Sequence, residues 1–289
     1  MNTADAYIYD TLTPANTAFY KNYGYLVAPK LLGAATIDRL RKETVAIFRG
    51  DRGPIEGLLP ASANGSDEEV LKQYVAMHFP HKLSVAIHDA LSDPDIVDIL
   101  REIIGPNLKC MQSMLFVKAP GKKGQSWHQD EFYIPTRDKS LCGVWIAIDD
   151  ATIDNGCLWI IPGRPDHIMR RVPNFNKEYA DVDTLDVSAQ GEPVPVEVKS
   201  GSVVFFNGYT LHSSKSNKTE NTFRMALVNH YMSAGSMLPW DQDGRLEPTE
   251  DLRDIVLVAG KDPYAWKGTV NVNKPYLRPE VLSIKTGTK

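Results

Sequence analysis

Two residues in the stretch SWHQDEFYIP are of types that bind metal ions. His128 and Asp130 are two positions apart, and on an extended strand residues at that spacing point to the same face. A neutral imidazole nitrogen and a carboxylate oxygen together suit a borderline divalent ion such as Fe(II). The alternative interpretation is a solvated turn, which is the usual structure of an isolated His-x-Asp.

A stable metal site needs more than two protein ligands, so a third must come from elsewhere in the chain. The candidate is His212 in FFNGYTLHSS, which follows the apolar segment SVVFF and a turn with Gly208. Two histidines and one carboxylate on one face of an octahedron leave three positions open, which is the arrangement of non-haem Fe(II) oxygenases. Those positions would admit a chelating cosubstrate and O2.

Arg224 lies twelve residues after His212, near the start of the apolar segment FRMALVNHYM. On a strand it shares a face with Ala226 and Val228, which are small enough to leave room for a ligand. An unpaired buried charge is costly, so a buried guanidinium needs an anion, and it can hold a carboxylate through two hydrogen bonds. An exposed arginine at the end of a strand is the alternative.

The chain after Lys109 consists mainly of short segments that are typical of β-strands, rich in β-branched and aromatic residues. No helical stretch long enough for a crossover recurs between them, which argues against a parallel α/β sheet. The predicted fold is therefore mainly β with flanking helices, arranged as a two-sheet sandwich or jelly roll. The predicted strand segments are CMQSMLFVK, LCGVWIAI, CLWIIP, VPVEV, SVVFF and FRMALVNHYM.

The first hundred or so residues are predicted to be mainly helical. AATIDRLRKETVAIF carries an apolar stripe at helical spacing. In DPDIVDILREIIGP, Asp93 suits the helix N-cap and Pro94 the first turn, while Gly105 and Pro106 end the helix. These helices are expected to pack on the outside of the β core.

The composition is that of an ordinary globular protein, with 43% hydrophobic and 24% charged residues among 289. The net charge of −4 gives no reason to expect nucleic acid or an anionic membrane as a partner. No apolar run approaches the roughly 20 residues that span a bilayer, and MNTADAYIYD lacks the features of a secretory signal. Three cysteines, an odd number, suggest no disulfide framework, so we expect a reduced, cytoplasmic protein.

Together these segments resemble the phytanoyl-CoA dioxygenase family of Fe(II)/2-oxoglutarate oxygenases, over about residues 20 to 235. The resemblance implies a double-stranded β-helix, a jelly-roll relative with a cupin-like core, in which His128, Asp130 and His212 hold iron. It is carried by YGYLVAPKLL, HFPHKLSVAIHDALSDPDI, GQSWHQDEFYIPTRD, GVWIAIDDATIDNGCLWIIPG, GSVVFFNGYTLHSS and the segment around Arg224.

The resemblance also implies which residues hold the cosubstrate, and it assigns no catalytic residue beyond the metal centre. Alternation along CMQSMLFVK places Gln112 and Met114 on one face, so Gln112 is a further candidate for the pocket. The residues implied to hold 2-oxoglutarate are Lys82, Met114, Gln129, Trp145, Ser214 and Arg224. The remaining histidines lack ligand-like spacing and are predicted to be structural or exposed: His78, His81, His88, His167 and His230.

We expect residues 1–289 to form a single dioxygenase domain. Its parts are a mainly helical region at 1–108, a metal-binding β core at 109–235 and a C-terminal extension at 236–289. The extension returns to mixed, polar sequence and carries none of the motifs above.

The expected activity is the hydroxylation of an unactivated C–H bond in a small or medium-sized organic molecule. Fe(II), 2-oxoglutarate and O2 would be required, and succinate and CO2 released. Asp130 speaks against a halogenase, because halogenating relatives carry Gly or Ala at that position. Two rivals stay open: a cupin-like Zn or Mn enzyme that catalyses hydrolysis or isomerisation, and a non-catalytic metal-binding barrel. The sequence names neither the substrate nor the oligomeric state.

Overall fold

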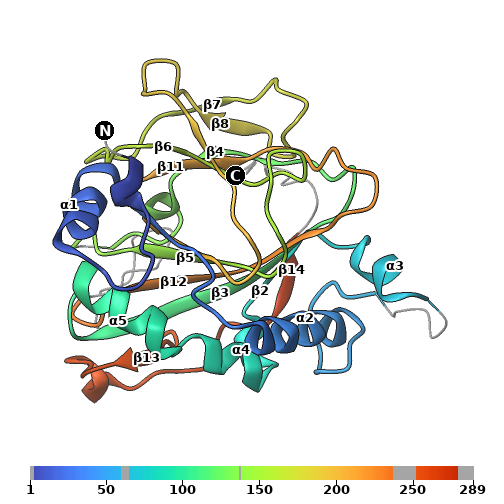
Figure 1. The fold of residues 1–289 in the computed structure, drawn as a ribbon. Coiled ribbons are helices and arrows are strands. Elements are labelled where there is room, and N and C mark those ends of the chain that lie inside the picture. Colours follow the sequence, from blue (N-terminus) through green and yellow to red (C-terminus); the bar gives the residue numbers. More distant parts are fainter. Residues whose placement is uncertain (1–2, 60–64, 137, 237–251, 279–289) are drawn as a thin grey trace, which may run out of the picture.

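Two antiparallel β-sheets face each other in the computed structural model, which describes residues 3–59, 65–136, 138–236 and 252–278 (Figure 1). The larger sheet has the order β1 (Tyr25–Ala28), β10 (Val203–Asn207), β5 (Cys142–Ala147), β12 (Arg224–Ser233), β3 (Leu108–Lys118), β2 (Ala76–His78) and β14 (Tyr276–Arg278), and β13 (Val256–Ala259) also pairs with β3. The smaller sheet has the order β4 (Gln125–His128), β11 (Leu211–Ser214), β6 (Leu158–Ile161) and β9 (Val194–Val196). A third pair, β7 (Arg171–Pro173) with β8 (Asp183–Leu185), lies above the smaller sheet in Figure 1.

The predicted fold class, a mainly β jelly-roll core with flanking helices, is confirmed. Strand pairs within the sheets are antiparallel, as expected for a chain without crossover helices. Each of the six segments predicted as strands contains one, namely β3, β5, β6, β9, β10 and β12. The two sheets turn their inner faces toward each other, and the alternate side chains of β3 and β12 on that face surround the site described below.

The helices cover the outer face of the larger sheet, where α2, α4 and α5 lie below it in Figure 1. Leu40, Ile87 and Leu100 from these helices join Phe205 of the sheet in one buried core cluster. None of the helices in the described ranges combines the length and apolar character that a membrane crossing requires. The α-helices are α1 (Pro14–Tyr23), α2 (Ala34–Phe48), α3 (Asp67–Leu71), α4 (Val85–Ala90) and α5 (Pro94–Ile103), and the 3-10 helices are η1 (Thr3–Ala6), η2 (Pro80–Lys82), η3 (Asp130–Phe132) and η4 (Ala265–Lys267).

Helix α5 begins as its sequence predicts. The side chain of Asp93 accepts hydrogen bonds from the backbone N–H groups of Asp95 and Ile96, and Pro94 occupies the first turn. Ile96 and Leu100 are fully buried against the core, and burial of each such side chain contributes roughly 1.5–3 kcal/mol. Because the helices bury the outer face of the sheet, the inner face remains for the cavity.

A buried histidine outside the site makes stability depend on pH. His81 lies in η2 with its Nδ1 2.6 Å from Oγ of Ser113, and burial lowers its pKa from 6.5 to about 4. The unfolded chain therefore takes up a proton below pH 6.5, whereas the folded chain takes it up only near pH 4. Because the unfolded state binds more protons in this window, part of the free energy of unfolding is lost progressively as the pH falls through it. We expect His81→Gln to reduce the loss by about 3 kcal/mol.

Urea unfolding at a series of pH values, followed by tryptophan fluorescence, measures this difference. His88→Gln is the control, because His88 is exposed on α4, and that variant should keep the pH dependence of the unmodified protein. If the free energy of unfolding changes equally with pH in the His81 variant and the unmodified protein, His81 is not the group responsible.

Candidate metal centre

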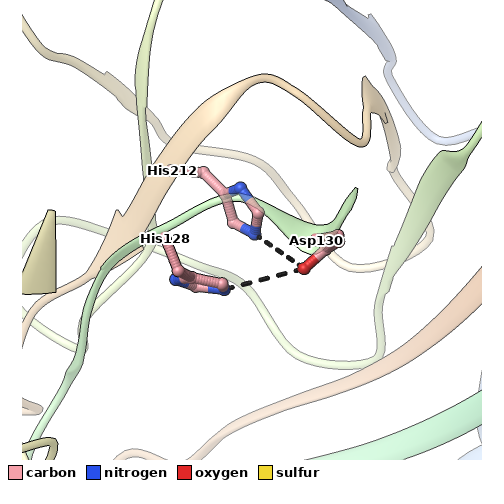
Figure 2. A group of neighbouring side chains, drawn as sticks. All are labelled: His128, Asp130 and His212. Atoms are coloured by element: carbon pink, nitrogen blue, oxygen red, sulfur yellow. Dashed lines mark ion pairs between the residues drawn. The ribbon is translucent and has the colours of Figure 1, made fainter. Parts of the chain in front are cut away.

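The three predicted metal ligands lie together between the two sheets (Figure 2). His128 ends β4 and His212 lies on β11, and the two strands pair with these residues directly opposite each other. Nε2 of His128 is 3.8 Å from Oδ1 of Asp130, and Nε2 of His212 is 3.6 Å from the same oxygen. One ligand atom from each residue lies within 4.8 Å of the others, which is the spacing that a shared ion requires.

Asp130 is not on a strand, and the expectation that it would be was wrong. Strand β4 ends at His128, and Asp130 is the first residue of η3. Gln129 between them is still extended, so the chain turns only after it and the side chain of Asp130 remains on the same side as His128. The two-residue spacing therefore identified the right neighbours, although the backbone changes direction between them.

Both imidazoles are held by their own strands in the orientation that a metal needs. Nδ1 of His128 lies 2.7 Å from the carbonyl oxygen of Ser126, and Nδ1 of His212 lies 2.9 Å from that of Thr210. Each Nδ1–H donates to a carbonyl, so each Nε2 keeps a lone pair. Nε2 of His128 lies 3.1 Å from the side-chain amide nitrogen of Gln125, which can donate to it. Burial, with a further effect of His212, lowers the pKa of His128 to about 3, so this ring is neutral, as a metal ligand must be.

The end of helix α1 fixes the turn that precedes His212. Gly24 closes this helix with a φ of +82°, and its carbonyl accepts a hydrogen bond of 3.0 Å from Oγ1 of Thr210. A Cβ on Gly24 would lie 2.3 Å from that oxygen, so the approach requires glycine. The carbonyl of the same threonine orients the His212 ring, which links the helix to the metal centre.

Asp130 is ionised, and its two carboxylate oxygens have different partners. Burial by itself would raise its pKa, but His212, His230 and His128 outweigh burial and hold the pKa of this carboxyl well below its usual value. Oδ1 faces the two proposed ligands, whereas Oδ2 lies 3.0 Å from Nε2 of His230. Two imidazoles and one carboxylate, open on the cavity side, form a donor set that fits Fe(II).

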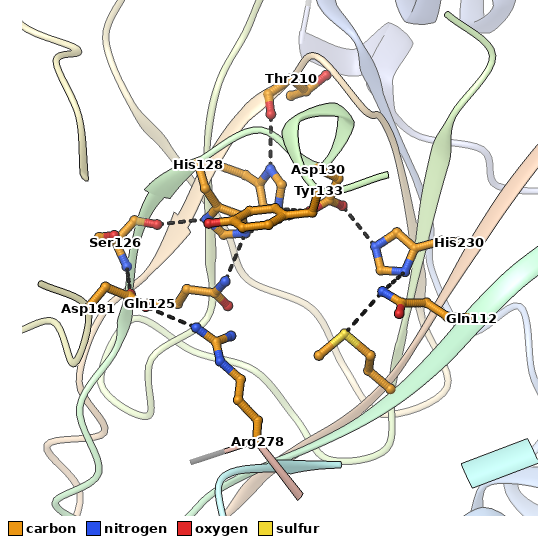
Figure 3. Close-up of polar contacts among 12 residues, drawn as sticks. Gln112, Gln125, Ser126, His128, Asp130, Tyr133, Asp181, Thr210, His230 and Arg278 are labelled. Atoms are coloured by element: carbon orange, nitrogen blue, oxygen red, sulfur yellow. Dashed lines mark hydrogen bonds and ion pairs between the residues drawn. The ribbon is translucent and has the colours of Figure 1, made fainter. Parts of the chain in front are cut away.

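His230, predicted from the sequence to be structural or exposed, contacts the proposed ligand Asp130 (Figure 3). The amide nitrogen of Gln112 lies 3.4 Å from Nδ1 of His230, so Nδ1 accepts and the ring proton is on Nε2, where it donates to Asp130. A signal was present, because His230 is six residues after Arg224 on β12 and an even spacing places both on the inner face. It was assigned no ligand role from the sequence because six residues is no familiar ligand spacing.

His230→Phe is expected to weaken Fe(II) binding by about 10–100-fold, because the outer oxygen of Asp130 loses the donor that orients it. Anaerobic metal titration followed by tryptophan fluorescence measures this affinity independently of turnover. His88→Phe is the matched control on an exposed helix position and should bind metal like the unmodified protein. Unchanged affinity in the His230 variant would show that this hydrogen bond does not position the carboxylate.

The metal centre opens into a cavity of about 390 Å³ between the sheets. Most of its wall is apolar or aromatic, which excludes bulk water and strengthens the few polar contacts inside it. The lining residues are His78, Gln112, Met114, Phe116, Gln125, His128, Asp130, Tyr133, Ile134, Trp145, Leu158, Phe206, His212, Ser213, Ser214, Arg224, Val228, His230, Tyr276 and Arg278.

Arg224 contributes a buried positive charge to this cavity. Only 4% of its surface is exposed, its Nε has no hydrogen-bond partner, and no carboxylate in the described part of the chain forms an ion pair with it. Its guanidinium carbon lies 5.6 Å from the ring centre of Trp145. Burial lowers its pKa to about 10, which still leaves the group charged near neutral pH. Such a cation requires an anion from outside the chain.

Ser214 is arranged to donate a hydrogen bond into the cavity beside Arg224. Its Oγ accepts a hydrogen bond of 2.9 Å from Nζ of Lys118 and one of 3.3 Å from the backbone N–H of Gln125. A hydroxyl that accepts twice has only its own hydrogen left to offer. Because the charged guanidinium of Arg224 lines the same cavity, the partner of this hydrogen is best an anion.

Five of the residues predicted for the cosubstrate or the pocket do line the cavity: Gln112, Met114, Trp145, Ser214 and Arg224. Two others do not, and both expectations are corrected here. Nζ of Lys82 contacts Asp254 at 2.5 Å and the carbonyl of Asn273 at 2.6 Å, so its charge is used elsewhere. The side chain of Gln129 lies on the far side of the backbone from the metal ligands.

The side chain of Gln129 instead forms hydrogen bonds with the backbone of neighbouring loops. Its amide nitrogen donates to the carbonyls of His167 and Tyr209, and its amide oxygen accepts from the backbone N–H of Met169. The extended backbone at Gln129 turns its side chain opposite to those of its neighbours, so it ties the segment of the metal ligands to two adjacent loops.

The cavity wall includes residues from the C-terminal segment that the sequence analysis assigned no role. Tyr276 and Arg278 lie on β14, which pairs with β2 at the edge of the larger sheet. The ring of Tyr276 stacks on that of His78, with centroids 4.3 Å apart. The segment is polar and lacks a strong strand pattern, so nothing in its sequence indicated that it would close the cavity.

Comparisons with known proteins agree with this geometry. The sequence model of the family described as phytanoyl-CoA dioxygenase (PhyH) matches residues 20–226. Human peroxisomal phytanoyl-CoA dioxygenase is 28% identical over 246 residues, which cover 78% of this chain and 70% of the human protein. The rat protein of that name is 30% identical over 237 residues, with coverage of 75% and 67%. A Danio rerio phytanoyl-CoA dioxygenase domain-containing protein 1 is 27% identical over 286 residues, with coverage of 84% and 97%.

Solved structures of non-haem oxygenases share the fold. SnoK, an α-ketoglutarate-dependent carbocyclase from nogalamycin biosynthesis, superposes with a TM-score of 0.62 at 23% identity and covers 82% of this chain and 92% of its own. ThoJ, a non-haem monooxygenase, gives a TM-score of 0.63 at 20% identity, with coverage of 92% and 88%. At these identities the likeness shows the common double-sheet architecture and leaves the substrate open.

Proposed function

We propose, on the premise that the chain belongs to the phytanoyl-CoA dioxygenase family, that it hydroxylates an unactivated C–H bond in a small or medium-sized organic molecule, with release of succinate and CO2. Membership of the family makes it an Fe(II)- and 2-oxoglutarate-dependent dioxygenase. The reaction type, the substrate and the roles of individual residues are the content of the proposal. We also propose that residues 1–289 act as one domain, since β14 from the C-terminal part pairs with β2 from the N-terminal part.

His128, Asp130 and His212 would hold the iron through two Nε2 atoms and Oδ1. Bound there, Fe(II) would supply the activation of O2 that no amino-acid side chain provides. The contribution of the chain is geometric: Ser126 and Thr210 fix the two rings through Nδ1, and His230 fixes the carboxylate through Oδ2. These contacts leave the cavity side of the centre open for exchangeable ligands.

The observation that carries the proposal is the buried, unpaired guanidinium of Arg224 in the same cavity as the His-Asp-His cluster. Arg224 would bind the far carboxylate of 2-oxoglutarate bidentately, and the hydroxyl of Ser214 would add a third hydrogen bond. Trp145 would pack along the carbon chain, with Met114 and Gln112 completing the wall. The two proposed anchors, Arg224 and the metal ligands, lie on different strands, so one ligand would bridge the two sheets.

A cupin-like Zn or Mn hydrolase would use the same three ligands, but it would leave Arg224 without an anion. A non-catalytic barrel would explain neither the oriented imidazoles nor the buried cation. Each of these two alternatives therefore leaves at least one of these features unexplained, whereas an oxygenase explains both the oriented imidazoles and the buried cation.

The experiment is succinate formation by the purified protein with Fe(II), 2-oxoglutarate and O2, measured with and without a mixture of small metabolites. We expect slow succinate release alone and faster release when the substrate is in the mixture. Zn(II) in place of Fe(II), and argon in place of air, should both abolish it. Succinate formation that is absent with Fe(II), or equal with Zn(II), would contradict the proposal.

We further propose a cytoplasmic location. Cys110, Cys142 and Cys157 are buried and unpaired, which suits a reducing compartment. Fractionation of cells that express the protein tests this, with a peroxisomal signal as the contrary result.

A further inference from the structure

A second arginine lies in the cavity and is not used by the cosubstrate scheme. Arg278 is the last residue of β14, and its side chain points from the strand toward Gln125 and Asp181, below His128 in Figure 3. It lies beyond residues 20–226, which match the family.

The guanidinium of Arg278 is held in place by a hydrogen bond and has further donors that no described residue uses. Its Nη2 donates to Oδ1 of Asp181 at 2.9 Å, and within the described part of the chain this is its one hydrogen bond. A guanidinium has five N–H donors, so the remaining donors are available to a ligand. Its side chain is 18% exposed, so part of its charge faces the open space of the cavity.

A chain of hydrogen bonds connects this guanidinium to the metal centre. Asp181 accepts from the backbone N–H of Ser126 at 2.7 Å through its Oδ2, while its Oδ1 holds Arg278. The carbonyl of the same serine accepts from Nδ1 of His128. Two successive contacts on one residue of β4 therefore fix both the metal-binding ring and the arginine, so a group bound to Arg278 has a defined position relative to the iron ligands.

Arg224 and Arg278 reach the cavity from strands that are not adjacent in the larger sheet. In the larger sheet β12 and β14 are separated by β3 and β2, which makes three strand spacings, or roughly 14 Å between their backbones. If Arg224 takes the far carboxylate and the metal the keto acid end, both ends of the cosubstrate are occupied. Arg278 then has no remaining group of that molecule to bind.

The approach to Arg278 is also basic. A second cavity adjoins the first and shares Phe116, Gln125, Ser214, Arg224 and Arg278 with it, and Lys122 and Lys123 lie on its wall. Positive charges along an entrance raise the local concentration of anions and speed their capture. This feature favours an acidic substrate over a neutral one.

We propose that Arg278 binds a free carboxylate of the substrate, and that this oxygenase therefore acts on a small organic acid. The inference rests on the proposed function and names its substrate class. The planar fork of a guanidinium matches a carboxylate, and the neighbouring Asp181 limits the net charge of the site, which suits a monoanionic group better than a phosphate. The stacked rings of His78 and Tyr276 beside it would contact the carbon skeleton.

The size of the cavity restricts this acid. About 390 Å³ is near the lower end of the range for small-molecule sites and must be shared with 2-oxoglutarate. The carbon that reacts must lie near the metal while the carboxylate is at Arg278, so the substrate is a short acid oxidised at a carbon away from its carboxyl group.

The test compares short mono- and dicarboxylic acids with their primary amides and their CoA thioesters as stimulants of succinate formation. We expect at least one acid to stimulate, and its amide and thioester to fail. Arg278→Gln should raise the KM for that acid by about 30-fold or more, because a charge-assisted hydrogen bond is lost, and should raise the KM for 2-oxoglutarate far less. Arg278→Lys, which keeps the charge, should recover part of the effect, and Arg101→Gln at an exposed helix position should change neither constant.

The outcomes separate the two claims. Absence of any 2-oxoglutarate turnover in the unmodified protein overturns the proposed function. Basal turnover that no free acid stimulates, or that an amide or a CoA thioester stimulates equally, overturns the assignment of Arg278. So does a KM for the acid that is unchanged in Arg278→Gln when thermal unfolding shows the variant to be folded.

Discussion

Replacing Asp130 with alanine is expected to lower succinate formation by on the order of 1,000-fold or more. Even loss of a residue that merely orients a ligand weakens metal binding by about 10–100-fold, and removal of a ligand itself should cost more. Asp130 also supplies the one negative charge between His128 and His212. The variant should therefore lose both Fe(II) affinity, measured by anaerobic titration, and activity.

The matched control is Asp98→Ala, since Asp98 is an exposed aspartate on helix α5. It should bind Fe(II) and form succinate like the unmodified protein. Retained metal affinity in the Asp130 variant, in protein shown to be folded by circular dichroism, would mean that another residue completes the ligand set. Lost activity with retained affinity would assign Asp130 a role other than metal binding.

The second large effect concerns Arg224 and has two opposite parts. Arg224→Met should raise the KM for 2-oxoglutarate by about 100-fold or more, because two charge-assisted hydrogen bonds are lost. The same change should stabilise the ligand-free protein by about 1–3 kcal/mol, because a buried cation without an ion-pair partner is replaced by an apolar side chain of similar length. Steady-state kinetics measure the first part and urea unfolding the second.

A cosubstrate analogue makes the Arg224 test specific. The unmodified enzyme should strongly prefer 2-oxoglutarate over 2-oxobutyrate, which lacks the far carboxylate, whereas Arg224→Met should discriminate between the two only weakly. Arg101→Met, at an exposed helix position, is the control for the substitution itself. A variant that is destabilised, or that keeps the full preference for 2-oxoglutarate, would show that Arg224 has a different partner.

The predicted residues that line the cavity include several whose position follows from local periodicity. Alternation along β3 and β12 places Gln112, Met114 and Arg224 on the inner face, because a strand has only two faces and one of them must meet the core. His212 could be proposed because two ligands needed a third. The fold brings these residues together across two sheets. The family resemblance implied that fold, whereas local periodicity did not.

The errors came from contacts that are distant in the sequence or from a change of backbone. Asp130 begins a 3-10 helix rather than continuing a strand, and no pattern in SWHQDEFYIP marks that change. Lys82 was expected in the cavity, but Asp254, far away in the chain, binds its amine. Arg278 enters the site through an edge strand whose pairing with β2 could not be foreseen from either segment.

His230 differs from these cases because a signal for it existed. It shares the inner face of β12 with Arg224, and the buried polar residue at such a position requires a partner. An even spacing from a residue already assigned to the site is therefore worth as much attention as a familiar ligand motif.

The most direct test is a crystal structure with Fe(II) and 2-oxoglutarate bound under anaerobic conditions, with iron located by its anomalous scattering. We predict one iron coordinated by Nε2 of His128, Oδ1 of Asp130 and Nε2 of His212, with the far carboxylate of 2-oxoglutarate on Arg224. An iron at any other site, or 2-oxoglutarate bound with its far carboxylate away from Arg224, would contradict it.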